Sequence, residues 1–281
     1  MMNNLWVKGW EFEVGGPGMW PPNYDGAFIQ LDDDLYGYVY LENNSIVLTV
    51  FNRSGFLNKQ SCPIEHPTIP SLWTIEKSDK DWIVYCNQQF QFHISSKGDI
   101  RQVPIPERFF HILNAYHFSN DPFVFGDFII EHKGSFGYSC SSINTQKKLW
   151  EIKVQGYLYT DMKRIDNQLF ICTAEHGGFV YCFDINTGDL YYKIRTGGTA
   201  KIQFGIDYFV CYELGKNGKV MLVDIKTGTL VDSIELYKTT IDCPLLLMDN
   251  SYIITLSFKK QQKHQYIGVI TGLAKVRQGT C

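Results

Sequence analysis

The feature that most constrains this sequence is a short segment that occurs twice. Residues 181–194 read YCFDINTGDLYYKI, and residues 221–234 read MLVDIKTGTLVDSI. Each copy holds an apolar run, an Asp-x-x-Thr-Gly turn and a second run with strand character. The Asp side chain accepts hydrogen bonds from backbone N–H groups two or three residues ahead, and Gly adopts the positive φ that a tight turn often needs. The segment therefore predicts two antiparallel strands joined by a turn.

Weaker copies of this turn extend through most of the chain. Decayed forms stand at 142–146 (SINTQ) and 268–272 (GVITG), and the segments HISSKGDI and FNRSGFL place turns at Gly98 and Gly55. The turn positions 55, 98, 146, 188, 228 and 272 are 40 to 48 residues apart, which is the length of one four-stranded propeller blade. Apolar runs opened by Asp or Asn precede these turns, and we interpret each as the second strand of a blade: DLYGYVYL, DWIVYC, DPFVFGDFII, DNQLFICT, DYFVCY and NSYIITLSF.

The repeat predicts how the apolar surface is buried. A four-stranded sheet has two apolar faces, and stacking the sheets around a common axis covers both. We therefore predict an all-β chain with a single β-propeller of six four-stranded blades over residues 25–281. Residues 1–24 form an N-terminal extension, in which the alternation of Trp10, Phe12 and Val14 with glutamates predicts an extra strand that closes the last blade. The GGPGMWPP segment after it is a loop by composition.

The cysteines fit the same scheme. Cys86, Cys172 and Cys211 each close an apolar run, and Cys140 and Cys182 each lie two residues before a turn motif. Blade packing holds such equivalent positions farther apart than the roughly 6 Å between Cα atoms that a disulfide requires. We predict buried free thiols that act as small apolar side chains.

Composition limits the classes of function. The chain of 281 residues is 44% hydrophobic and 15% aromatic, as in globular proteins. Its formal charge is −3 and it has no cluster of five or more basic residues, so direct binding of nucleic acid is not supported. No apolar run reaches eighteen residues and no secretory leader is recognisable, so we expect a soluble cytoplasmic protein that does not enter a membrane.

The Asp-x-x-Thr-Gly copies within FVYCFDINTGDLYYKI resemble the PQQ-like and WD40-like repeats of β-propellers, over roughly residues 25–280. Quinoprotein enzymes of this type carry a tryptophan after the Thr-Gly turn, use eight blades and are exported. Here Leu149-Trp150 alone has such a tryptophan, so we predict no cofactor. The compact single propeller also resembles the immunity proteins of bacterial contact-dependent growth inhibition systems with EndoU-type nuclease toxins. That resemblance implies a chain that binds and neutralises its cognate toxin nuclease.

A propeller places the hairpins between second and third strands at one end of the blades, together with the linkers between blades. We predict that this end contacts the protein partner, with acidic and aromatic residues meeting a basic RNA-binding cleft. The predicted partner-binding residues are Trp20, Glu42, Glu131, His132, Tyr159, Asp161, Glu175, His176 and Glu213.

Other interpretations of these residues are weaker. The Glu-His pairs at 131–132 and 175–176 could approach a metal or serve acid–base chemistry, but no third ligand is evident and a catalytic zinc needs three. Residues 32–34, three aspartates, fit a calcium site or an acidic contact less well than a solvated turn. We predict no metal and no enzyme. The alternatives are a general protein-interaction scaffold and a small hydrolase or lyase that acts at the central channel.

Overall fold

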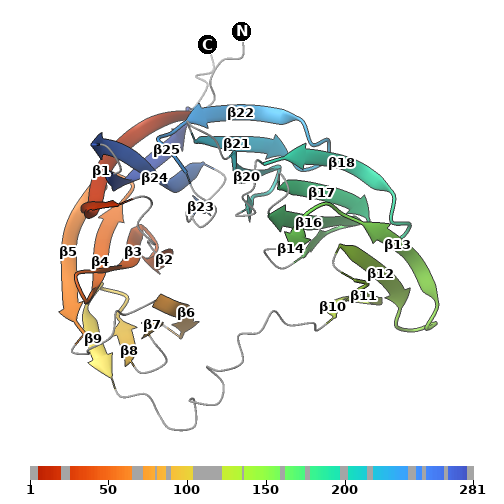
Figure 1. The fold of residues 1–281 in the computed structure, drawn as a ribbon, viewed down its shortest axis with the longest axis horizontal. Helices are drawn as coiled ribbons and strands as arrows, with labels where there is room; N and C mark the ends of the chain where they lie inside the picture. The colour runs from red at the N-terminus through yellow and green to blue at the C-terminus, as the bar shows by residue number, and fades with distance from the viewer. Residues whose placement is uncertain are drawn as a thin grey trace. The chain divides into compact units, whose positions relative to one another are not determined.

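The computed structural model describes residues 6–19, 26–64, 72–79, 81–86, 90–103, 122–134, 136–158, 162–174, 178–196, 202–213, 218–239, 245–248, 251–262 and 265–276. Within these ranges the chain forms antiparallel sheets and no helix (Figure 1). No helix in this part of the chain is long and apolar enough to cross a membrane. The predicted fold class, an all-β propeller type with six blades, is confirmed by six sheets that each fill four strand positions.

The blades are numbered here in chain order. Blade 1 contains β2 (Ala27–Asp32), β3 (Leu35–Glu42), β4 (Ser45–Asn52) and β5 (Gly55–Pro63), and blade 2 contains β6 (Leu72–Ser78), β7 (Asp81–Cys86), β8 (Phe90–Ile94) and β9 (Ile100–Val103). Blade 3 contains β10 (Phe123–Phe125), β11 (Phe128–His132), β12 (Gly137–Ser142) and β13 (Lys148–Lys153). Blade 4 contains β14 (Tyr157–Leu158), β15 (Lys163–Ile165), β16 (Gln168–Ala174), β17 (Phe179–Asp184) and β18 (Leu190–Arg195); both β14 and β15 pair with β16, so they share the first strand position.

The remaining strands complete two more sheets. Blade 5 contains β19 (Ile202–Phe204), β20 (Tyr208–Glu213), β21 (Lys219–Asp224) and β22 (Leu230–Glu235). Blade 6 has the order β1-β25-β24-β23, with β1 (Trp6–Met19), β25 (Gln265–Lys275), β24 (Tyr252–Gln262) and β23 (Leu245–Met248). The N-terminal strand is thus the fourth strand of the last blade. It also runs to Met19, so the prediction of a loop from Gly15 was wrong for residues 15–19, whose backbone pairs as an edge strand.

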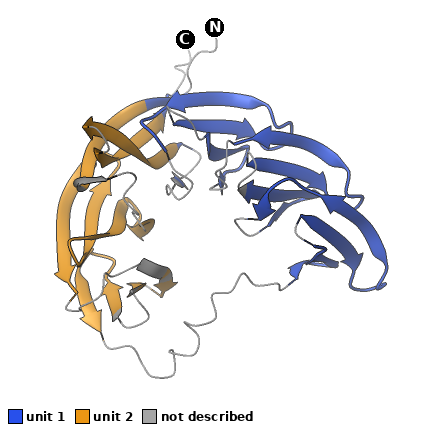
Figure 2. Cartoon of the chain, in the orientation of Figure 1, with its two compact units in different colours: residues 1–7, 118–251, 275–281 blue, residues 8–117, 252–274 orange. Residues whose placement is uncertain are grey.

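Two compact units divide the chain (Figure 2). Unit 1 comprises residues 1–7, 118–251 and 275–281, and it holds blades 3, 4 and 5. Unit 2 comprises residues 8–117 and 252–274, and it holds blades 1 and 2 with β24 and most of β25. Each unit has its own buried apolar clusters.

Two predicted boundaries were wrong. The run DPFVFGDFII was assigned to one second strand, but Gly126 has a φ of 64° and the run turns there, so it supplies both β10 and β11. The decayed turn at 268–272 lies inside β25, where Gly272 pairs with Ile254. Glycine is required at position 272 for another reason: a Cβ there would lie 2.5 Å from Cε2 of Trp10.

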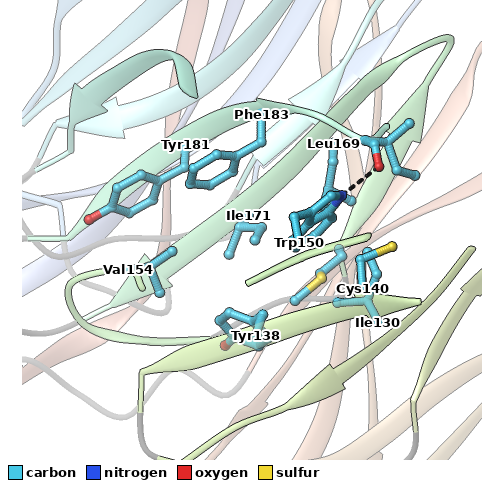
Figure 3. Packing of buried hydrophobic residues seen from close by; sticks show 11 residues of the cluster. Ile130, Tyr138, Cys140, Trp150, Val154, Leu169, Ile171, Tyr181 and Phe183 are labelled. Atoms are coloured by element: carbon cyan, nitrogen blue, oxygen red, sulfur yellow. Dashed lines mark hydrogen bonds between the residues drawn. The ribbon is translucent and has the colours of Figure 1, made fainter. Parts of the chain in front are cut away.

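The Thr-Gly turns carry out a second task that the sequence did not reveal. The Trp150 Nε1 of blade 3 donates a hydrogen bond of 2.7 Å to the Ile185 carbonyl in the blade 4 turn (Figure 3), and the Tyr192 hydroxyl of blade 4 donates one of 2.6 Å to the Ile225 carbonyl of blade 5. A Cβ on Gly188 would lie 2.7 Å from Cγ of Trp150. The glycine therefore leaves room for the aromatic ring of the preceding blade as well as adopting a positive φ.

The buried core of unit 1 contains the thiols predicted to be there. Cys140 lies with Trp150 and Ile171 between blades 3 and 4 (Figure 3), and Cys172, Cys182 and Cys211 lie in the cluster between blades 4 and 5. All four are free and buried, and Cys62 is free and partly exposed. The prediction of free thiols is confirmed for these residues; the side chain of Cys86 lies outside the described part.

Candidate functional site

Four of the predicted site residues are described by the structure, and each lies at the end of a blade where the second and third strands meet. This end, called here the hairpin end, includes Glu42 at the end of β3, Glu131 and His132 at the end of β11, and Glu213 at the end of β20. Five other predicted residues lie outside the described part of the chain: Trp20, Tyr159, Asp161, Glu175 and His176. The placement of the four described residues at hairpins agrees with the predicted topology.

Each of the three predicted glutamates in the described part of this end has a lysine of its own blade as a partner. The Lys59 Nζ lies 2.5 Å from Oε2 of Glu42, the Lys133 Nζ lies 3.7 Å from Glu131, and the Lys219 Nζ lies 3.5 Å from Glu213. Partial burial works to lower the pKa of Lys59, but the hydrogen bond to Glu42 and the neighbouring Tyr40 outweigh it, so the pKa of Lys59 is raised. These glutamates therefore present ion pairs rather than bare negative charge. Their role in partner binding stays a prediction.

The ring of His132 packs beside an aromatic side chain. Its ring lies 4.7 Å from that of Tyr138, whose pKa is raised to about 12 by burial. Among the described residues, no group of three or more His, Cys, Asp or Glu side chains is arranged to hold a metal ion. The geometry of His132 is that of a ring packed beside an aromatic side chain.

An aromatic patch that the sequence did not single out lies at the same end of unit 1. Phe136 and Tyr157 have ring centroids 5.0 Å apart, and Tyr157 is 48% exposed. The Lys193 Nζ lies 3.7 Å from the centroid of Phe179. The signal that could have revealed this patch is the position of Phe136 and Phe179 directly beside hairpins, where a solvated turn does not call for aromatics.

The opposite end of unit 1, called here the turn end, holds the turns at 126–127, 143–147, 166–167, 185–189, 206–207 and 225–229. In each blade a backbone hydrogen bond joins its two turns: Ile143 N to Asp127 O (2.8 Å), Ile185 N to Asn167 O (2.9 Å) and Ile225 N to Asp207 O (3.0 Å). With the bonds from Trp150 and Tyr192 between blades, these contacts make the turn end a rigid surface.

Two of the turn aspartates, Asp184 and Asp224, have lowered pKa values because they accept hydrogen bonds. The Tyr191 hydroxyl donates to Asp184 and is the largest cause of the lowered pKa of this carboxyl, followed among hydrogen bonds by the N–H groups of Asn186 and Thr187. The Thr227 N–H donates to Asp224 over 2.7 Å and is the largest cause of its lowered pKa. The predicted role of Asp in these turns is thereby confirmed.

Exposed large apolar side chains gather at the turn end. Ile206, in the turn between β19 and β20, is 80% exposed, and Leu190, the first residue of β18, is 51% exposed. Four more exposed apolar residues of unit 1 lie in or directly after its turns: Ile143, Leu149, Tyr191 and Leu230. A one-residue bulge recurs here, because β13, β18 and β22 each have an extra residue opposite the third strand, at Leu149, Tyr191 and Val231. Exposed apolar side chains that lie together, rather than singly, mark binding surfaces in many proteins.

Unit 2 has a polar cavity at its own turns. It has a volume of about 580 Å³ and is lined by Gln30, Leu31, Asp32, Asp33, Lys77, Asp79 and Ser96. The predicted solvated turn at residues 32–34 forms one wall, where Asp34 pairs with Arg53 over 3.3 Å. Two aromatic and aliphatic side chains after the next turn, Phe56 and Leu57, are about half exposed.

Comparison with known proteins identifies no family. The sequence matches no protein-family model. No curated protein sequence is similar to it. Among solved structures, the chain is similar to BamB from Moraxella catarrhalis, with 10% sequence identity, a TM-score of 0.38 and coverage of 96% of this chain and 91% of that one.

Proposed function

We propose that this chain is a protein-binding module. The observation that carries the proposal is the gathering of exposed apolar side chains, led by Ile206 and Leu190, at one end of three interlocked blades. Exposing these apolar side chains to water is unfavourable in free energy, and a partner that covers them removes this unfavourable contribution. Because hydrogen bonds within and between the blades already fix these turns, little conformational entropy is lost on docking.

Within this class, we propose a cytoplasmic immunity protein that binds a cognate toxin nuclease and covers its active site. The support is the overall character of the aromatic-rich blade repeats, which resembles that of such proteins, together with a surface suited to docking. The chain would act by steric blockade, so no reaction and no cofactor of its own is part of the proposal. A general interaction scaffold is the coarser alternative and would use the same surface.

Co-expression with the product of the neighbouring gene tests the proposal. If that product carries a nuclease domain, we expect the two chains to copurify in a fixed ratio, the nuclease to lose activity on RNA in the complex, and growth of cells that express the nuclease to be rescued. A nuclease that stays active with an excess of this chain, and cells that are not rescued, would contradict the immunity function.

A further inference from the structure

We infer that the turn end of unit 1 is the docking surface, and that it receives a protein surface that is basic and carries apolar side chains. This inference rests on the proposed function, because it names the face and the chemistry of the partner. It differs from the expectation from sequence, which placed the partner at the hairpin end.

The distribution of apolar exposure favours the turn end over the hairpin end. In unit 1, six exposed large hydrophobic side chains lie in the turns or within two residues after them. In the described part of the hairpin end, Tyr157 is the exposed large hydrophobic side chain. Ile206 is the most exposed of all of them. Covering such side chains with a partner removes apolar surface from water, which favours binding.

The charge at the turn end selects the partner. The six turns and the ends of β17 and β21 carry the carboxylates of Asp127, Asp166, Asp184, Asp189, Asp207 and Asp224, with Lys147 and Lys226 as the cations in the same segments. Arg164, which lies beside them in β15, donates hydrogen bonds from its guanidinium to the backbone carbonyls of Asp166 and Phe125. The lowered pKa values of Asp184 and Asp224 keep those two ionised well into the acid range.

The two ends therefore differ in a way that decides between them. At the hairpin end of unit 1, the two glutamates near the ends of second strands pair with lysines, Glu131 with Lys133 and Glu213 with Lys219. At the turn end Asp189 and Asp207 are exposed next to the exposed apolar residues Leu190 and Ile206. Apolar contacts bordered by unneutralised carboxylates complement a basic surface with apolar side chains and repel an acidic one.

Footprinting with model peptides tests the surface without knowledge of the natural partner. The first probe is a sixteen-residue peptide that alternates pairs of lysines with pairs of leucine and tryptophan, and the second has glutamate at each lysine position. Hydrogen exchange of the full chain at low salt should show protection by the lysine peptide at residues 143–147, 185–191, 206–207 and 225–230. The glutamate peptide should give none, and the affinity for the lysine peptide should fall about tenfold between 50 and 500 mM salt.

Single substitutions sharpen the test. Ile206→Ser and Asp207→Lys change exposed side chains and leave intact the backbone bond from Ile225 N to the carbonyl of residue 207. Each should weaken the lysine peptide about tenfold, which is about 1.4 kcal/mol. Tyr157→Ser, at the hairpin end and 48% exposed, is the matched control and should change the affinity less than twofold. Circular dichroism and thermal unfolding verify that each variant is folded.

The outcomes separate this inference from the proposed function. Protection of the hairpin end, equal binding of both peptides, or loss of binding in Tyr157→Ser alone would overturn the turn-end surface. Concentration-dependent self-association that Ile206→Ser abolishes would assign the surface to a second copy of this chain and would also overturn it. If the neighbouring nuclease is inhibited but protects the hairpin end, the function holds and the surface fails. If it does not bind while the lysine peptide protects the turns, the surface holds and the immunity function fails.

Discussion

Replacing Gly188 with alanine tests the double role of the turn glycine. Gly188 has a φ of +77°, and an added Cβ would lie 2.7 Å from Cγ and 2.9 Å from Cβ of Trp150. A left-handed backbone conformation costs a residue with a Cβ about 1–2 kcal/mol. Forcing a methyl group into a packed ring costs about 1–3 kcal/mol more. We expect Gly188→Ala to lower the free energy of unfolding by about 2–5 kcal/mol, the sum of both effects.

Gly134 offers a matched control. Its φ is +71°, but a Cβ there would meet no atom within 4 Å. Gly134→Ala should therefore show the conformational cost alone, about 1–2 kcal/mol. The difference between the two variants isolates the contact between the turn of blade 4 and the ring of blade 3.

Urea unfolding of the full chain, followed by circular dichroism and by tryptophan fluorescence, measures both variants. Coincident transitions by the two probes establish that one free energy describes the step. In a Trp150→Leu background, which removes the indole ring, Gly188→Ala should cost no more than Gly134→Ala does in the wild-type chain. Equal losses for Gly188→Ala and Gly134→Ala in the wild-type background would refute the reasoning, because the ring would then place no constraint on the turn.

Three further predictions follow from single residues. Gln146, in the decayed turn, has a φ of 55°, which is unfavourable for a residue with a Cβ and favourable for glycine. Gln146→Gly should therefore raise the free energy of unfolding by about 0.5–1 kcal/mol. An unchanged or lower urea midpoint would contradict this. The pKa of Asp224 is lower in the folded protein than in the unfolded chain. The stabilisation that this carboxylate provides is therefore present above its unfolded pKa of about 3.9, and it is lost as pH falls through the folded pKa. The difference in Tm between the wild type and Asp224→Asn should be larger at pH 6 than at pH 2.5, and an equal difference at both would count against this reasoning. Burial raises the pKa values of Cys140 and Cys182 to about 11. Iodoacetamide at pH 8 should therefore modify partly exposed Cys62 before Cys140 and Cys182, as mapped by mass spectrometry of peptides, and labelling of either buried thiol as early as Cys62 would disprove its burial.

The repeat made much of the fold predictable because its requirements are local. Asp184 and Gly188 act within five residues of each other, so the turn and its two strands could be inferred without a partner element. The error at 268–272 has the opposite cause. Gly268 and Gly272 serve contacts with Val14 and Trp10 from a strand more than two hundred and fifty residues earlier in the chain, and no local pattern reports such a contact.

The candidate site was less predictable for a related reason. Two of the hairpin glutamates have lysine partners on other strands, where the sequence does not show them: Lys59 on β5 for Glu42 on β3, and Lys219 on β21 for Glu213 on β20. Pairing of this kind depends on register, which places Ser45 opposite Glu42 and brings β5 alongside β4. Sequence reasoning therefore located the hairpins but did not reveal the ion pairs that their glutamates form with these lysines.

The turn end also explains how one surface can serve both folding and recognition. Asp184 and Asp224 must be kept for the turns themselves, because their carboxylates hold the N–H groups of the next residues. The side chains of Ile206 and Leu190 are apolar and cannot hold backbone N–H groups in this way, and they are 80% and 51% exposed. The aspartates would then place negative charge at fixed positions, while the residue types at the exposed apolar positions could be exchanged to suit a partner. A set of variants at positions 190 and 206 should accordingly change partner affinity with little change in Tm, whereas variants at 184 and 224 should change both.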